Sequence, residues 1–276
     1  NVLGDTTFAA PMNHNKLNGT GYYHPGKKGY YPVTYDQSDV DQSFEIKDVL
    51  GQVIAKKTFN KGDAVSNTSY NGYNGKVTFK GSYNDDGRLD GKVYDYYPDG
   101  SKELETNFVD GKKEGAATRY APDGTAVLVM MYEDGDLVSY GETAEKQVKI
   151  DKPVMHIQFE YENGKPKVDI TLKYGSFDGD WKIYNKNGTV GVSRQYKLGN
   201  RHGVDTTYNK NGKILKIVPH KGGDTNGEVV EYDGNGKVIR RTNYLNDEKQ
   251  GWEFHYRKGR LIKSVYYYNG DPIIEK

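Results

Sequence analysis

The sequence predicts an all-β protein, an elongated, curved and open antiparallel sheet of tandem β-hairpins. Three observations support this prediction: a repeat of 24 residues, a fixed spacing of Gly and Tyr inside each repeat, and a composition with 34 Gly, 25 Tyr and only 34% hydrophobic residues. Tyr fits a pleated, half-buried surface, and Gly supplies tight turns. We therefore expect Tyr to replace Leu as the main packing residue.

The charge balance and the aromatic content exclude several classes of protein. A net charge of +1 and 13% aromatic residues indicate a folded chain, because disordered chains are poor in aromatics and strongly charged. The evenly mixed charges create no field that would attract nucleic acid. No apolar run reaches the roughly 18 residues of a membrane helix. We expect neither nucleic-acid binding nor membrane insertion.

The repeat is clearest in the C-terminal part of the chain. Its units begin at Gly179, Gly203, Gly227 and Gly251, which lie 24 residues apart. A tyrosine follows five residues after the first glycine of each unit, there and in two N-terminal units. These tyrosines form one candidate binding or packing ladder: Tyr96, Tyr120, Tyr184, Tyr208, Tyr232 and Tyr256.

The glycines inside each unit predict its turns. In sequences such as YNKNG, Asn and Asp favour a turn, and Gly takes the left-handed position that closes a three-residue loop with a bulge. A further Gly near the end of the unit makes the next turn. Each unit therefore reads strand, turn, strand, turn, with no room for a helix. The repeat turn glycines are Gly100, Gly124, Gly188, Gly212 and Gly236.

The register of the repeat divides the chain into four segments. Inside the third, Val168, Ile170 and Leu172 alternate with polar residues, which predicts an additional strand. The segments are an N-terminal cap or degenerate first repeat (1–40), an N-terminal array (41–140), an irregular insertion (141–178) and a C-terminal array (179–276).

The signature G-x4-Y-x3-G, followed by an aromatic residue and x2-G, resembles the MORN repeat variant of bacterial YwqK-type antitoxins. Motifs such as GVDTTYNKNG (203–212) carry the resemblance, which covers roughly residues 42–276. It implies a hairpin-repeat fold and a role in binding, for example the masking of a toxin. Two other families fit less well. The segment 231–242 resembles a YD repeat of toxin-encasing shells, and choline-type wall-binding repeats rely on Trp, which occurs only twice.

No residue pattern indicates catalysis, a cofactor or a metal. The chain has no cysteine and no phosphate-loop motif, and its six histidines show no metal-ligand spacing. Nucleophile elbows are missing, and no carboxylate pair is singled out for glycoside cleavage. Acidic residues such as Asp85, Asp86 and Asp233 belong to predicted turns for backbone reasons, although calcium binding there stays open. We predict that the protein is not an enzyme.

We therefore expect a non-catalytic scaffold for protein–protein interaction, in a bacterial protein that is secreted or part of the cell envelope. The absence of cysteine, the polar composition and a first residue other than Met favour this location. Two alternatives stay open. One is an intracellular antitoxin or immunity protein of the YwqK type in the cytoplasm, and the other is a glycan-binding surface protein. No cofactor is expected, and the oligomeric state is open.

Overall fold

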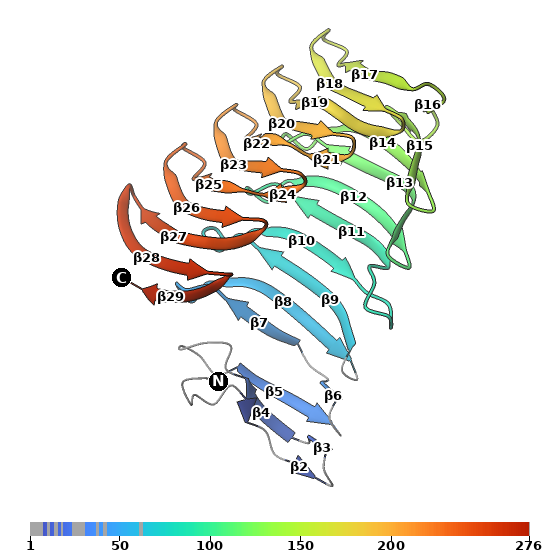
Figure 1. Cartoon of the computed structure of the whole chain (residues 1–276). Helices are drawn as coiled ribbons and strands as arrows, with labels where there is room; N and C mark the ends of the chain where they lie inside the picture. Colours follow the sequence, from blue (N-terminus) through green and yellow to red (C-terminus); the bar gives the residue numbers. More distant parts are fainter. Residues whose placement is uncertain are drawn as a thin grey trace. The chain divides into compact units, whose positions relative to one another are not determined.

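The structure, a computed structural model, describes residues 8–9, 12–13, 16–17, 19–23, 31–36, 39–40, 43–60 and 63–275. All regular elements in these ranges are β-strands (Figure 1). The predicted class, an open antiparallel β-structure of tandem hairpins, is confirmed, and the hairpins are distributed over two large open sheets. Within the described ranges, no helix has the length and apolar character needed to cross a membrane.

The N-terminal strands are short. They form a four-stranded sheet in the order β1-β4-β5-β6 and a two-stranded sheet, β2-β3. The predicted N-terminal cap (1–40) lies partly outside the described residues, as do His14 and His24. The strands are β1 (Phe8–Ala9), β2 (Met12–Asn13), β3 (Lys16–Leu17), β4 (Gly19–Tyr23), β5 (Tyr31–Asp36) and β6 (Asp39–Val40).

The first large sheet has ten strands that follow one another in chain order. Such sequential antiparallel pairing is what hairpins joined by short turns produce. The strands are β7 (Ser43–Lys47), β8 (Val53–Asn60), β9 (Asp63–Tyr70), β10 (Val77–Ser82), β11 (Gly91–Tyr96), β12 (Lys102–Val109), β13 (Lys112–Tyr120), β14 (Ala126–Glu133), β15 (Asp136–Gly141) and β16 (Gln147–Lys149).

The second large sheet has 13 strands and begins inside the predicted insertion. Its β18 shows the expected alternation, since Val168, Ile170 and Leu172 are buried. The strands are β17 (Val154–Glu160), β18 (Pro166–Lys173), β19 (Ser176–Tyr184), β20 (Val190–Lys197), β21 (Asn200–Arg201), β22 (Gly203–Tyr208), β23 (Ile214–Lys221), β24 (Asp224–Thr225), β25 (Gly227–Tyr232), β26 (Val238–Leu245), β27 (Glu248–Arg257), β28 (Arg260–Tyr268) and β29 (Asp271–Glu275).

The chain forms two compact units. The first comprises residues 1–94 and 108–112, and the second comprises residues 95–107 and 113–276. The second unit contains the hydrophobic core and all of the sites described below. Residues of both large sheets contribute to that core: Ala117, Leu128 and Met130 come from the first sheet, whereas Trp181 and Val192 come from the second. Within this unit the two sheets therefore pack face to face.

Aliphatic side chains dominate this core. Tyr is more frequent than Leu among its buried residues, as expected, but Val and not Tyr is the main packing residue. Among the described residues the buried hydrophobic set includes seven Val and four Ile beside five Tyr. The reason is that a second sheet covers this face. Two sheets in contact exclude water from the faces between them, so a buried phenol hydroxyl needs a partner, whereas an aliphatic side chain does not.

Two kinds of hairpin turn alternate along the chain. In the first kind, Tyr97 N donates to Ser101 O and Gly100 N donates to Tyr97 O, at 2.8 Å each. Gly100 has a φ of 86°. This is the predicted three-residue loop with a glycine bulge. In the second kind two consecutive residues have positive φ, as in Asp110 (49°) and Gly111 (81°), which defines a two-residue type I′ turn.

Side chains tie each turn to the next repeat. Tyr97 OH donates to the backbone oxygen of Tyr120 at 2.6 Å, and Tyr161 OH donates to that of Tyr184 at 2.7 Å. On the other edge, Leu198 N donates to Asp178 Oδ1 at 2.9 Å. These contacts join residues 20 to 23 positions apart, so they fix the stacking of neighbouring hairpins.

Candidate functional site

The face of the 13-stranded sheet that carries Trp181, Ile183 and Val192 is called its inner face here, and the opposite face its outer face. Residues alternate between the two faces along a strand. In β27, Glu253 and His255 are buried on the inner face, so the following Tyr256 points outward. The same alternation places the ladder residues of the second sheet on its outer face: Tyr184, Tyr208, Tyr232 and Tyr256.

All six ladder tyrosines are half-buried, and none belongs to the buried core. In the first sheet, Lys102 Nζ lies 5.1 Å from the centre of the Tyr120 ring, which is cation–π geometry. The repeat turn glycines all have positive φ, from 78° to 88°. They are Gly100, Gly124, Gly188, Gly212 and Gly236.

Charged residues replace apolar ones on part of the inner faces. Glu103 of β12 accepts hydrogen bonds from Arg119 Nη1 at 2.9 Å and from Arg194 Nη2. Both guanidinium groups also lie over the Trp181 ring, at 4.8 and 5.0 Å from its centre. Asp205 of β22 extends the cluster, since its Oδ2 lies 3.5 Å from Arg194 Nε and also pairs with Arg201. This Glu103 cluster joins the two sheets across 91 residues of sequence.

The arginines keep the Glu103 carboxylate ionised. Burial by itself would raise its pKa, but the charges of Arg194 and Arg119 outweigh burial and lower the pKa of Glu103 to about 2. The same balance holds at Glu231 of β25. There burial is outweighed by Arg240 and Lys216, and the pKa of Glu231 is lowered to about 2.

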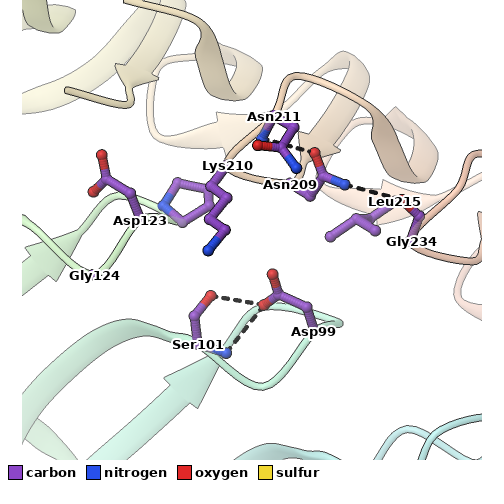
Figure 2. A pocket seen from close by; sticks show the side chains of 10 residues that line it. Asp99, Ser101, Asp123, Gly124, Asn209, Lys210, Asn211, Leu215 and Gly234 are labelled. Carbon is purple, nitrogen blue, oxygen red and sulfur yellow. Dashed lines mark hydrogen bonds between the residues drawn. The ribbon is translucent and has the colours of Figure 1, made fainter. Parts of the chain in front are cut away.

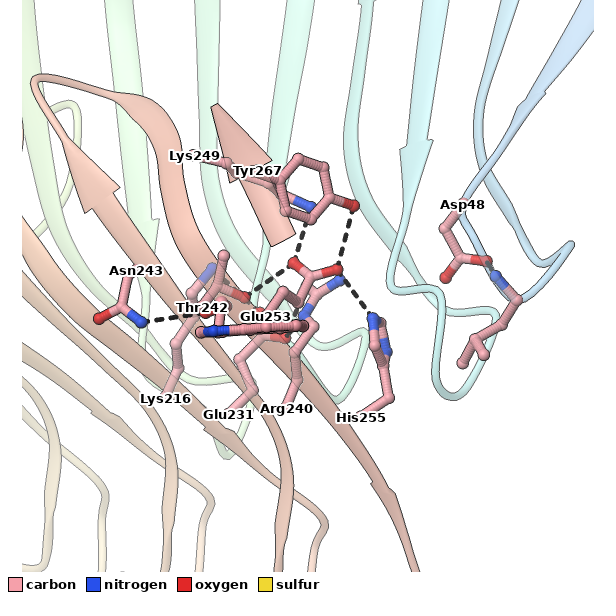
Figure 3. A network of polar contacts seen from close by, with 12 residues as sticks. Asp48, Lys216, Glu231, Arg240, Thr242, Asn243, Lys249, Glu253, His255 and Tyr267 are labelled. Atoms are coloured by element: carbon pink, nitrogen blue, oxygen red, sulfur yellow. Dashed lines mark hydrogen bonds and ion pairs between the residues drawn. The ribbon is translucent and has the colours of Figure 1, made fainter. Parts of the chain in front are cut away.

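A second network surrounds Glu253 (Figure 3). Lys249 Nζ lies 2.7 Å from Glu253 Oε2, and Thr242 Oγ1 donates to the same oxygen at 2.9 Å. His255 Nε2 lies 2.8 Å from Oε1, and Tyr267 OH donates to Oε1 at 3.4 Å. Burial alone would raise the pKa of Glu253, but these partners hold it below its usual range.

The Glu253 network has the side-chain types of an acid–base catalytic site, but it is too buried for a substrate to reach it. Glu253 is 1% exposed and His255 is 4% exposed, and both carboxylate oxygens are engaged. A buried charge that is fully hydrogen-bonded stabilises a unique arrangement of strands when all its partners are present. The network therefore acts as a polar substitute for the apolar core in this part of the inner face. Across the described residues, no group of three His, Cys, Asp or Glu side chains could hold a metal ion.

A pocket of about 400 Å³ lies among hairpin turns of both sheets (Figure 2). The first sheet contributes Asp99, Ser101 and the turn at Pro122–Gly124. The second contributes the turn containing Lys210 and Asn211, together with Leu215 and Gly234. Two carboxylates, an ammonium group and the amides of Asn209 and Asn211 thus line the pocket together with apolar side chains. Such a mixture suits a small polar ligand with both donors and acceptors.

Two type I′ turns on the other edge of the second sheet carry unusual residues. Tyr174 and Leu198 have φ values of 50° and 47°, where Asn, Asp or Gly is preferred. Their side chains are 72% and 54% exposed. The two turns are adjacent, because Gly199 N donates to Phe177 O at 2.8 Å. Exposed apolar side chains gain little from burial, and backbone strain of this kind is concentrated at functional sites.

The sequence analysis did not single out these positions, although it contained signals for them. At Tyr174 and Leu198, the signal is a bulky residue at a position where the matching turns have Asp, Gly or Asn, as at Asp110, Gly222 and Asn246. For the buried networks, the signal is a charged residue two or four positions after the first glycine of a unit, as at Arg119, Asp205 and Glu253.

The fold and these features define a tandem β-hairpin repeat protein. The family model described as MORN repeat variant matches residues 89–110 and 225–246, so these segments are repeats of the MORN variant type. Repeats of this type generally act as modules that bind proteins or lipids.

Comparisons with whole proteins do not extend the family assignment beyond these two segments. No curated protein matches the chain. Among solved structures, a chain of the crystal structure of TcdB2-TccC3 is similar at 10% identity and a TM-score of 0.16. The matched region covers 90% of this chain but only 19% of that chain, so this protein spans a small part of that chain's length.

Proposed function

We propose that the protein is a non-catalytic repeat scaffold that binds another protein through the edge formed by Tyr174 and Leu198. The observation that carries the proposal is the combination of positive φ and large exposure at these two side chains. A left-handed conformation costs a non-glycine residue roughly 1–2 kcal/mol. An exposed Tyr offers a large contact area at low entropic cost, which suits a protein interface.

The test compares variants that relieve the strain with and without removing an apolar side chain. Tyr174→Asn combined with Leu198→Asn removes both side chains and suits the turn. Lys258→Asn is the matched control, because Lys258 has a φ of 52° in the same kind of turn but carries no apolar contact group. Each protein is used as bait in lysate of its source organism, and retained proteins are quantified by mass spectrometry.

We expect a protein that is retained by the original chain and by Lys258→Asn but lost with the double variant. The same proteins retained by all three baits, or none retained by any, would contradict the proposed binding edge.

The tyrosine ladder is a second candidate contact surface. Its outer face also carries Trp252, which lies edge-on to Tyr266 at 5.4 Å between ring centres. Loss of binding in Tyr208→Ser with Tyr232→Ser, without loss in the Tyr174 and Leu198 double variant, would move the proposed interface to this face.

The pocket favours the glycan alternative. Its lining of Asp99, Asp123, Asn211 and Lys210 offers donors and acceptors for hydroxyl groups. Chemical-shift changes of these residues on titration with oligosaccharides would support glycan binding, and their absence would leave only the protein partner.

We also propose that the protein is exported to the bacterial cell envelope or secreted, with a cytoplasmic antitoxin of the YwqK type as the alternative. The lack of cysteine supports export. Fractionation of the source cells separates the two, since an antitoxin must stay in the cytoplasmic fraction and protect a co-expressed toxin's target.

A further inference from the structure

Four turns of the first kind contain an Asn-Gly pair in matched positions. In each, the glycine nitrogen donates to a backbone oxygen three residues earlier, at 2.7–2.9 Å. The asparagine side chains are all exposed. The four turns therefore share the Asn-Gly pair, the backbone hydrogen bond of its glycine and the exposure of its asparagine, and they differ in the contacts of the asparagine side chain. The pairs begin at Asn163, Asn187, Asn211 and Asn235.

The side chains of Asn163 and Asn187 are fixed by hydrogen bonds. Asn187 Oδ1 accepts hydrogen bonds from Thr189 N at 2.9 Å and Thr189 Oγ1 at 2.7 Å, while its Nδ2 donates to Lys210 O at 3.1 Å. Asn163 Oδ1 accepts from Lys165 N at 3.1 Å, and its Nδ2 donates to Lys186 O at 3.1 Å. Each amide nitrogen thus reaches the backbone oxygen 23 residues ahead.

The side chains of Asn211 and Asn235 do not reach a backbone oxygen 23 residues ahead, for two different reasons. The oxygen 23 residues beyond Asn211 belongs to Gly234, and it already accepts a hydrogen bond from Asn209 Nδ2 at 3.2 Å. The residue 23 positions beyond Asn235 is Lys258, which lies in a two-residue type I′ turn rather than a three-residue loop. Within the described chain, the side-chain amides of Asn211 and Asn235 have no hydrogen-bond partner.

We infer that Asn211 and Asn235 are sites of spontaneous deamidation, and that Asn163 and Asn187 are protected. In this reaction the nitrogen of the following glycine loses its proton and attacks Cγ of the asparagine. A bond forms between that nitrogen and Cγ, the Cγ–Nδ2 bond breaks, and ammonia leaves. Water then adds to one of the two carbonyls of the cyclic imide and opens it to aspartate or isoaspartate.

Glycine after asparagine permits this attack because it has no side chain to hinder the nitrogen. In all four turns the glycine nitrogen is hydrogen-bonded, so each turn must open before this nitrogen can attack. This step therefore does not make the four rates different. A held side chain must in addition break two or three hydrogen bonds before Cγ can approach the nitrogen. Each hydrogen bond that must break lowers the rate of deamidation several-fold. We therefore expect deamidation at Asn163 and Asn187 to be slower than at Asn211 and Asn235 by roughly tenfold or more.

The reaction at Asn211 would change the pocket. Asn211 lines it beside Asp99 and Asp123 (Figure 2), so deamidation adds a third carboxylate to this site. Isoaspartate also lengthens the backbone by one carbon within a turn whose Asn209 N to Lys213 O hydrogen bond is 2.8 Å. The added negative charge of both products makes the pocket less suited to an anionic ligand.

The test is peptide mapping of the full chain during incubation at neutral pH and 37 °C. Mass spectrometry with electron-transfer fragmentation gives the rate at each asparagine and separates aspartate from isoaspartate. The same incubation in concentrated urea removes the folded contacts. We expect fast conversion of Asn211 and Asn235 in the folded protein, and similar rates at all four positions in urea.

Asn209→Asp provides an internal control. The aspartate keeps the oxygen that accepts from Asn211 N and Lys213 N, as Asp233 does in the next repeat, but it has no amide donor. Gly234 O then becomes free for Asn211, and we expect slower conversion of Asn211 with no change at Asn235. Equal folded-state rates at Asn187 and Asn211, or the folded-state difference persisting in urea, would overturn the inference.

Discussion

Gly191 of β20 faces Pro122 of the turn between β13 and β14 so closely that a β-carbon on Gly191 would lie 2.5 Å from Pro122 Cδ. Next to this contact, Lys186 N donates to Asp123 Oδ2 at 2.7 Å. These two contacts join the sheets of the second unit at their turn edge. Glycine at position 191 is therefore required by distance and not by backbone conformation.

The first prediction concerns this contact. We expect Gly191→Ala to lower the free energy of unfolding by about 1–3 kcal/mol, because an added methyl group overpacks the joint between the sheets. Gly234→Ala is the control, since no atom lies within 4 Å of a β-carbon there and no positive φ is recorded. It should change stability by less than about 0.5 kcal/mol. Urea unfolding midpoints measure both, and equal midpoints would contradict the steric argument.

The second prediction concerns the Glu103 cluster. Glu103→Gln leaves Arg119 buried beside Trp181 without its carboxylate partner, and leaves Arg194 with only the 3.5 Å contact to Asp205. The removal of one partner from a buried ion pair costs about 3–5 kcal/mol. We expect a loss of that order in urea unfolding. Glu162→Gln removes the same charge from an exposed turn and should leave the midpoint unchanged. A Glu103→Gln variant as stable as the original would show that the cluster does not hold the sheets together.

The third prediction is the pH dependence that follows from these carboxylates. Glu103 and Glu231 have folded-state pKa values lowered from 4.5 to about 2. A lowered pKa means that the folded state binds protons less readily than the unfolded state. The corresponding stability is fully present above pH 4.5 and is lost as the pH falls towards 2. Urea midpoints measured across this range should fall steeply, and less steeply in Glu231→Gln. A flat profile would contradict the assignment.

The fourth prediction concerns the strained turns. Leu198→Asn should raise the free energy of unfolding by about 1 kcal/mol, because Asn tolerates the left-handed conformation better than Leu. The turn hydrogen bond from residue 198 N to Asp178 Oδ1 is unaffected by the change. Thermal unfolding gives the sign directly. A destabilised variant would mean that the Leu198 side chain contributes to the fold, and the argument for a binding role would lose its basis.

The fifth prediction concerns the ties between repeats. Tyr161→Phe removes the hydroxyl that donates to Tyr184 O at 2.7 Å, and we expect a loss of about 0.5–1.5 kcal/mol. Tyr174→Phe is a control at an exposed phenol and should leave stability unchanged. Hydrogen exchange at the turn of residues 185–188 adds a local measure, since the tie lies next to it. Unchanged exchange in Tyr161→Phe would argue against a role in stacking.

The sequence predicted the hairpins because their turns depend on local residues. Gly100 and Gly188 are needed for positive φ in any context, so their spacing revealed the repeat. The second layer depends on which face is buried, and the relevant positions carry residues as different as Trp181, Arg119 and Glu253. No apolar stripe marks that face from repeat to repeat. The regularly spaced ladder tyrosines are the clearest aromatic pattern in the sequence, although they lie outside the core.

For a similar reason, the sequence holds only partial signals for the candidate sites. The pocket joins Asp99 to Asn211, and the Glu103 cluster joins β12 to β20, so both depend on how the two sheets meet. At Tyr174 and Leu198 the sequence shows a bulky residue before Gly, and a binding role is indicated only once backbone conformation and exposure are known together.

The ties between turns also bear on how such a chain can change over generations. Tyr97 and Tyr161 each bind a backbone oxygen of the following hairpin, and every residue type has such an oxygen. A duplicated or deleted unit therefore meets a compatible neighbour at once, whatever its surface residues are. Whole hairpins can therefore be gained or lost beside units that carry this Tyr, whereas the units with Ala121, Asn185, Asn209 or Asp233 at the matching position depend on other contacts.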